Sequence, residues 1–346
     1  MSVMNRFHFH VAVLVTVLVP SIACSQRPVV SRGEGAITEA LIRRHVNVIA
    51  DDSMLGRNTP SRGLDMTASY IAAQFKRLGL KPGGDSGTYI QRYPISKAGS
   101  ASGGPAVGSD GFDPSSAPNA IGILTGSDPI LRNEYIVVSA HMDHVGVNGA
   151  NVKDSIYNGA DDDASGTAGV LALAEAFAQA PPKRSIIFLT VSGEEHGLWG
   201  SAWFVENPPV PVERMVADLN LDMIGRNWKD SIVVIGIEHS DLGTTAALAA
   251  AAHDELGISL MRDPWPQENF FGRSDHYNFA RRGVPALFFF NGVHDDYHQP
   301  SDSPDKIDAE KESRVVRLIY QVGLAVGNAA SRPKWDPESY KRIVRP

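Results

Sequence analysis

Residues 135–144 have the sequence YIVVSAHMDH, in which a short apolar run ends at two histidines and an aspartate. The run from Tyr135 to Ala140 has the length of a β-strand and almost no polar residue, which is typical of a strand covered on both faces. The chain downstream contains further apolar runs of strand length. They are Ser185–Val191, Val216–Leu221, Ile232–Ile235 and Ala286–Phe290.

Helical patterns alternate with these runs. Stretches such as Ala164–Gln179 and Thr244–Leu256 lie between the strands, and upstream Ile37–Ala50 and Leu64–Leu78 carry apolar residues at spacings of three and four. The last of these ends at Gly79, a natural helix C-cap. We therefore predict an α/β protein: a three-layer sandwich with a central mixed, mostly parallel β-sheet flanked by helices.

Length and composition fit one large α/β domain or two small ones. The chain has 346 residues, 43% of them hydrophobic, and a formal charge of −7 without a basic run long enough to follow a phosphate backbone. We therefore expect no nucleic-acid partner. We predict a catalytic domain over 33–331, with a Gly/Ser/Pro-rich surface loop at 96–119, and a C-terminal tail over 332–346. Oligomeric state has no sequence signal.

The N-terminus has the pattern of a signal peptide over 1–24. Arg6 gives a weakly positive start, and Val11–Val19 form an apolar stretch too short to span a bilayer. Cys24 follows Ser21-Ile22-Ala23, which resembles a bacterial lipobox except that Ser21 stands where Leu is usual. We expect export to the periplasm or outer membrane as a lipoprotein with a lipid anchor at Cys24, or alternatively secretion after cleavage near Ala23. A single cysteine allows no intramolecular disulfide.

Polar residues follow the ends of the predicted strands. His141 and Asp143 follow the first strand, Glu194 and Glu195 the second, and Asp222 the third. Ligand sites in open α/β sheets lie at the carboxyl ends of strands, so these side chains should converge. Two further segments carry similar residues, NGADDDASG at 158–166 before a helix and HDDYHQP at 294–300 after the last strand.

Each of these patterns has an ordinary structural interpretation when taken alone. The acidic trio Asp161–Asp163 would usually cap a helix, and a His-x-Asp is usually a hydrogen-bonded pair. Five segments that separately place His or carboxylate at such positions favour a zinc site with nitrogen and oxygen ligands. Neither a Gly-x-Ser-x-Gly elbow nor a His-Glu-x-x-His helix occurs.

The ordered motifs resemble the M28 family of co-catalytic zinc aminopeptidases: His-x-Asp, a Gly-Ala-Asp-Asp loop, Glu-Glu, a later Asp and a final His. The resemblance extends from about Leu55 to Ile319. It implies two zinc ions per chain and a peptide substrate, from which N-terminal residues are released by a metal-bridging hydroxide. Carried onto this chain, it makes Asp162 the carboxylate shared by both ions. One ion would be completed by His141 and Asp222, the other by Glu195 and His298.

The same resemblance implies supporting roles. Asp143 would orient the His141 imidazole, and Glu194 would be the general base. Tyr297 would hydrogen-bond the oxyanion, or else simply pack. We expect His144, His196, His276 and His294 to be neighbours of the ligands and not ligands themselves.

Other functions remain open at this point. They are a carboxypeptidase or dipeptidase of the same fold, a glutaminyl cyclase with one zinc, and a non-catalytic binding protein that has lost its metals. We expect the substrate pocket to prefer peptides with an apolar N-terminal residue. The candidate aromatic residues of this pocket are Trp265, Phe270, Phe271 and Tyr297. Cobalt or manganese could occupy the same ligands in vitro.

Overall fold

A computed structural model describes residues 33–95, 113–148 and 154–345. The predicted signal peptide, Cys24 and most of the predicted loop at 96–119 lie outside these residues. Within the described part, no helix is both long and apolar enough to cross a bilayer.

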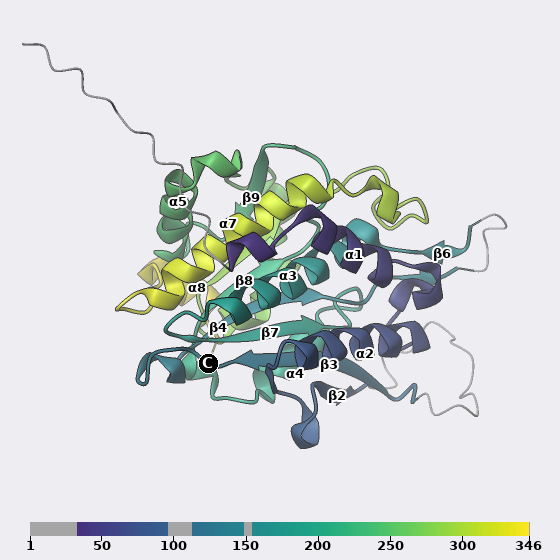
Figure 1. Cartoon of the computed structure of the whole chain (residues 1–346), viewed down its shortest axis with the longest axis horizontal. Coiled ribbons are helices and arrows are strands. Elements are labelled where there is room, and N and C mark those ends of the chain that lie inside the picture. Colours follow the sequence, from purple (N-terminus) through teal and green to yellow (C-terminus); the bar gives the residue numbers. More distant parts are fainter. Residues whose placement is uncertain (1–32, 96–112, 149–153, 346) are drawn as a thin grey trace, which may run out of the picture. The chain divides into compact units, whose positions relative to one another are not determined.

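Nine strands of the described residues form one mixed sheet (Figure 1). Its order is β1-β3-β7-β4-β8-β11-β9-β10, with β2 paired to β3. At its centre β7, β4, β8 and β11 run parallel, whereas β3 and β9 join this group antiparallel. The strands are β1 (Lys81–Pro82), β2 (Ile90–Pro94), β3 (Ser116–Leu124), β4 (Tyr135–His141), β7 (Ser185–Val191), β8 (Met215–Leu221), β9 (Ser231–Ile235), β10 (Ser259–Met261) and β11 (Ala286–Phe290). A separate hairpin consists of β5 (Gly146–Val147) and β6 (Ile156–Tyr157).

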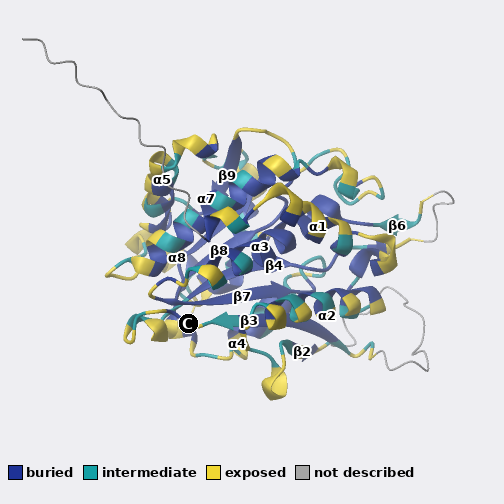
Figure 2. Ribbon diagram, viewed as in Figure 1, coloured by how far each residue is buried: buried dark blue, intermediate teal, exposed yellow. Residues whose placement is uncertain are grey.

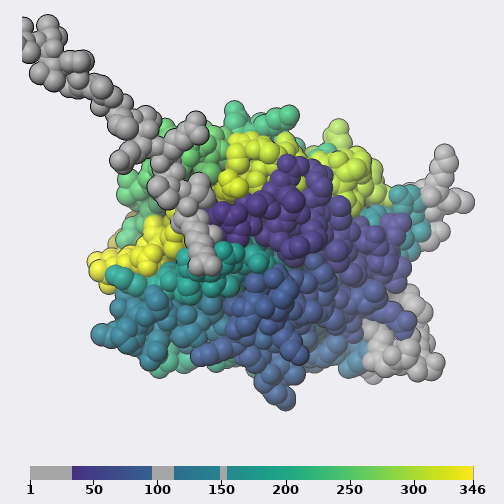
Figure 3. Space-filling model, in the orientation of Figure 1, coloured from purple at the N-terminus to yellow at the C-terminus, as the bar shows by residue number. Residues whose placement is uncertain are grey.

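Helices cover both faces of the sheet. They are α1 (Glu39–Ile49), α2 (Arg62–Arg77), α3 (Gly166–Gln179), α4 (Trp199–Glu206), α5 (Leu242–Ala252), α6 (His276–Arg281), α7 (Ala309–Asn328) and α8 (Pro337–Ile343). The first, α1, and α7 are far apart in the sequence but lie side by side (Figure 3). Thr38 caps α1 and Ser61 caps α2 through their side chains, and Gly79 has the positive φ expected just after α2.

Side chains along each central strand point alternately to the two faces of the sheet, which divides the core into layers. On β4, Ile136 and Val138 belong to the large cluster that contains residues of α1, α2, α3, α5 and α7. Val137 points to the opposite face, where it packs with Phe204 of α4 and Phe279 of α6. The central strands are therefore buried on both sides (Figure 2), and the predicted three-layer α/β sandwich is confirmed.

Two segments differ from the sequence-based expectation. Residues 116–119, expected in the loop, begin β3. Pro118 is tolerated there because β3 pairs with β7 only from Ala120 onward, so the missing N–H interrupts no bond to β7. The expected tail also packs on the domain: Trp335 donates to the Gly283 carbonyl at 2.9 Å, and Ile343 of α8 packs with Ala280 and Ala286.

Candidate functional site

The carboxyl ends of the parallel strands bring the predicted site residues together. His141 is the last residue of β4, Glu195 follows β7, and Asp222 directly follows β8. His298 lies in the segment after β11. Asp162 comes from η5 (Ala160–Ser165), the irregular turn that leads into α3.

Asp162 lies between two groups of side chains, one at each of its oxygens. At Oδ1, the Nε2 atom of His141 lies 3.2 Å away, and the same nitrogen is 3.6 Å from Oδ1 of Asp222. We call His141 and Asp222 the buried arm, because the His141 side chain is only 1% exposed.

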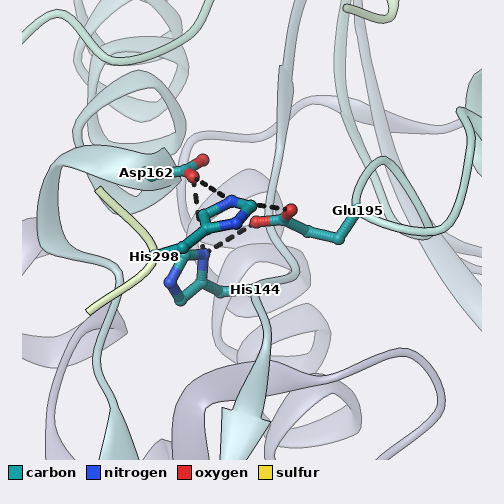
Figure 4. Close-up of side chains that lie close together, drawn as sticks. All are labelled: His144, Asp162, Glu195 and His298. Carbon is teal, nitrogen blue, oxygen red and sulfur yellow. Dashed lines mark hydrogen bonds and ion pairs between the residues drawn. The ribbon is translucent and has the colours of Figure 1, made fainter. Parts of the chain in front are cut away.

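The second group lies at Oδ2 of Asp162 (Figure 4). Nε2 of His298 is 3.0 Å from this oxygen and 3.0 Å from Oε2 of Glu195. We call Glu195 and His298 the open arm, because the His298 side chain is 34% exposed although Glu195 is only 6% exposed.

The donor set fits metal ions better than it fits hydrogen bonds. Oδ2 of Asp162 and Nε2 of His298 are both buried and lie 3.0 Å apart, yet neither makes a well-aligned hydrogen bond. Buried polar atoms are normally hydrogen-bonded, so converging atoms without such bonds indicate a missing partner. Histidine nitrogens and carboxylate oxygens are the donors that zinc accepts.

The electrostatics also favour cations at both arms. Burial alone would lower the pKa of His298, but the neighbouring carboxylates of Asp162 and Glu195 raise this pKa to about 10. Burial opposes ionisation of His141 as well, yet Asp222, Asp143 and Asp162 raise its pKa well above the ordinary value. The carboxylates of each arm therefore stabilise positive charge on the histidine. A bound metal ion would supply that charge in place of the histidine proton.

His144 lies closer to the expected metal ligands than the sequence indicated. It is fully buried, and its Nδ1 lies 2.8 Å from Oε1 of Glu195 and 3.7 Å from Oδ2 of Asp162. Gly159, at φ 53°, allows this approach, because a Cβ there would lie 2.5 Å from the His144 ring. His144 thus fixes the Glu195 carboxylate and is a further member of the open-arm cluster, which sequence spacing alone did not identify.

Glu194 lines the same pocket as His141, Asp162 and Asp222. Burial, together with Asp222, Asp275 and Glu195, raises the pKa of Glu194 well above its usual range, although His141 opposes this shift. A carboxylate with a raised pKa beside a candidate metal cluster is suited to accept and return a proton.

Asp143 links His141 to the segment that carries Glu194. Its Oδ1 lies 3.6 Å from Nδ1 of His141, and its Oδ2 accepts hydrogen bonds from Gly193 N at 2.7 Å and from the Thr59 hydroxyl at 2.9 Å. The position is fully buried, so Asp143 can orient the imidazole and the Glu194 segment together.

The other acidic and histidine neighbours have structural partners. Asp163 accepts hydrogen bonds from Gly166 N at the start of α3 and from His141 N, whereas Asp161 accepts from Gly225 N and pairs with His294. Of the other two histidines that the sequence placed near the ligands, His196 hydrogen-bonds to Asn58 and His276 packs against Phe288.

The pocket that His141, Asp162, Glu194 and Asp222 line also has apolar side chains in its wall. Of the four aromatic candidates, Phe270 and Tyr297 line it, whereas Trp265 and Phe271 pack behind them. The sequence did not reveal the other wall residues, which are Met223, Phe288, Phe290, Val293 and Arg273. Arg273 lies over the Phe270 ring, 4.7 Å from its centroid, and brings a positive charge next to the aromatic side chains of the pocket.

In sequence, the chain is similar to known peptidases. The model of peptidase family M28 matches residues 119–323. A probable zinc metalloprotease of Pyrenophora teres f. teres is 27% identical over 76% of this chain and 58% of its own length. Aminopeptidase YwaD of Bacillus subtilis is 26% identical over 68% of this chain and 49% of its own length. The chain thus spans about half the length of these curated relatives.

Solved structures share the fold. An aminopeptidase from Aneurinibacillus sp. strain AM-1 aligns with a TM-score of 0.64 at 17% identity, covering 88% of this chain and 97% of that one. The zinc aminopeptidase BSAP from Bacillus subtilis aligns with a TM-score of 0.65 at 18% identity, covering 86% and 97%. At such identities the likeness concerns the fold alone.

Proposed function

Because this chain belongs to peptidase family M28, we propose that it is a metallo-aminopeptidase that binds two zinc ions and releases N-terminal residues from peptides. One observation carries the proposal: the two oxygens of Asp162 face two separate donor groups, the buried arm and the open arm. A carboxylate in that position can be shared by two ions. His141 and Asp222 would hold one of them, Glu195 and His298 the other.

The bound ions would supply the chemistry that side chains lack, since zinc lowers the pKa of a bound water and polarises a carbonyl group. Glu194 would take the proton from the attacking water and return it to the leaving amine. Its raised pKa suits both transfers. Asp143 would hold His141 and the Glu194 segment in fixed positions relative to each other during these steps.

We propose that Tyr297 assists by donating a hydrogen bond to the oxyanion. Its ring stacks on His298 with centroids 3.9 Å apart, and it lines the pocket beside Asp162. Burial and the neighbouring carboxylates raise the pKa of its phenol, so the hydroxyl keeps its proton and can donate a hydrogen bond.

The pocket would accept the side chain of the N-terminal residue. Its lining combines apolar side chains with the carboxylates of Glu194 and Asp222, which favours a free ammonium group beside an apolar side chain. We therefore propose apolar N-terminal residues as the preferred substrates.

Arg273 supports a second candidate, a carboxypeptidase or dipeptidase of the same fold. A guanidinium on the pocket wall can bind a carboxylate with two parallel hydrogen bonds. A dipeptide would present its C-terminal carboxylate within reach of such a site.

The test compares leucine-p-nitroanilide with N-acetylated and C-terminally blocked peptides, using the full chain, its Glu194→Gln variant and a metal analysis of both. We expect about two zinc ions per chain, cleavage of free-amine substrates only, and a loss of activity of about 10²–10⁴-fold in the variant with zinc retained. Cleavage that depends on a free C-terminus would favour the second candidate. Inactive protein without metal would contradict both.

Export remains a separate proposal. We propose that the chain is exported as a lipoprotein anchored through Cys24, in line with the signal-peptide pattern. Membrane fractions of cells that express the chain and its Cys24→Ser variant would test this. Equal membrane association of both forms would contradict the anchor.

A further inference from the structure

Arg57 is a buried cation at the back of the candidate site. It ends η2 (Asp52–Arg57), the short helical segment after α1, and its side chain is among the largest that are fully buried. Its backbone adopts a left-handed conformation with φ 51°. Burying a guanidinium is costly unless its donors are satisfied, so the partners of Arg57 indicate what the residue does.

The guanidinium donates to carbonyl groups of three separate segments. Nε donates to Met142 O at 2.9 Å, between His141 and Asp143. Nη1 donates to Asn158 O at 2.6 Å and Nη2 to Gly159 O at 2.9 Å, shortly before Asp162. Nη1 also donates to Ile49 O at 2.8 Å, at the end of α1.

The backbone of Arg57 adds a fourth connection. Its carbonyl accepts a hydrogen bond from His144 N at 3.3 Å. One residue therefore ties the end of β4, the turn that carries Asp162 and the end of α1 to one another. Among the hydrogen bonds of the described residues, no other single side chain joins these three segments.

The charge of Arg57 matters as well as its geometry. Burial lowers its pKa to about 10, while Asp143 and Asp162 oppose this shift, so the guanidinium is charged at neutral pH. None of its four hydrogen bonds goes to a carboxylate. The charge acts on the carboxylates of the site through space, and the donors are left to fix the backbone.

We propose that Arg57 is a positioning residue that sets the separation between His141 and Asp162 and thereby the zinc affinity of the site. The inference rests on the proposed function, since it assumes that these two residues bind zinc. Residues that orient metal ligands from behind typically change metal affinity or activity by about 10–100-fold when replaced.

The chain offers a matched control in Arg184, a second buried arginine that also donates to backbone carbonyls. It is 1% exposed and donates to Val326 O at 2.8 Å, Ala329 O at 2.6 Å and Glu134 Oε2 at 2.7 Å. Arg184 precedes the first residue of β7, whereas the site lies beyond the last residue of that strand. Arg184 thus shares with Arg57 its burial and its donation to backbone carbonyls, differs in its additional bond to a carboxylate, and lies away from the site.

The experiment measures zinc affinity by chelator competition on the full chain, with melting temperatures in excess zinc and in chelator. Arg57→Lys, Arg57→Gly and Arg184→Lys are compared with the unaltered chain. Glycine is chosen because it tolerates the left-handed backbone. We expect both Arg57 variants to bind zinc about 10–100-fold more weakly, with partial recovery of Arg57→Gly by added guanidinium ion, and Arg184→Lys to keep zinc affinity within about twofold.

Each other outcome overturns the inference. Unchanged zinc affinity in Arg57→Lys would do so, and so would an equal loss in Arg184→Lys. An Arg57→Lys chain that fails to fold even in excess zinc, while Arg184→Lys folds, would assign Arg57 to the fold and not to the site. Failure of the unaltered chain to bind zinc would instead overturn the proposed function.

Discussion

The two arms of the site differ in how far water reaches them. In the buried arm, His141 is 1% exposed and is held by Asp143 from behind, whereas His298 of the open arm is 34% exposed and lies on a segment after the last strand. Asp162 belongs to both arms. We infer from this contrast that the two arms have different roles. The buried arm would bind its ion tightly, and the open arm would be the side at which the substrate enters.

The largest effect should follow replacement of the residue that the arms share. Asp162→Asn removes negative charge from both donor groups at once, so we expect loss of both zinc ions and of all measurable hydrolysis. Elemental analysis and leucine-p-nitroanilide turnover measure these quantities. Asp295→Asn, an exposed change on the segment that carries His298, should keep both ions. If the Asp162→Asn chain still bound one zinc ion tightly, the proposal that Asp162 is a ligand of both ions would be contradicted.

The pH dependence of zinc binding should be the next largest effect. The pKa of His298 is raised to about 10 in the metal-free chain, so the imidazole is protonated at neutral pH and must lose that proton to bind zinc. Zinc affinity of the open arm should therefore rise about tenfold per pH unit from 7 toward 10. Titrations at several pH values measure this slope, and a His298→Gln variant that keeps it would contradict the assignment.

The arms should also differ in what they contribute to stability. In metal-free protein, His141→Gln leaves Asp143 and Asp222 buried without their partner, and we expect a loss of roughly 3–5 kcal/mol in the free energy of unfolding. His298→Gln should cost about 1 kcal/mol, because water reaches that position. Urea unfolding in chelator compares the two variants. Equal losses would mean that exposure does not distinguish the arms.

The smallest effect concerns specificity beside the arms. The guanidinium of Arg273 should repel lysine side chains from the pocket, so we expect leucine substrates to be preferred over lysine substrates. Arg273→Met should narrow that preference by a few-fold, since a partly exposed charge contributes on the order of 1 kcal/mol or less. The ratio of kcat/KM values for the two substrates measures it. Equal turnover of both substrates by the unaltered chain would refute the proposed pocket.

The sequence predicted the parts of the fold that depend on local pattern. The bounds of β7 and β11 match the apolar runs because buried parallel strands contain almost nothing else. In contrast, β3 was missed, because Ser116, Pro118 and Asn119 are typical of a loop and become a strand only through pairing with β2.

The site shows the same limit. The convergence of the five expected ligands could be predicted because each follows a strand or precedes a helix, positions that the sheet topology brings together. Their choice as ligands came from the resemblance to the M28 family. Arg57 could not be found, since its partners Met142 and Gly159 are 85 and 102 residues away and offer only backbone carbonyls, which carry no sequence signal. The position of His144 against Glu195 likewise depends on tertiary packing.

A crystal structure of the zinc-loaded chain, with anomalous scattering measured at the zinc edge, tests the central claim most directly. The account predicts two peaks about 3.5–4 Å apart. One would lie between Asp162 and the buried arm, the other between Asp162 and the open arm. A single peak, or a pair that does not share Asp162, would contradict it.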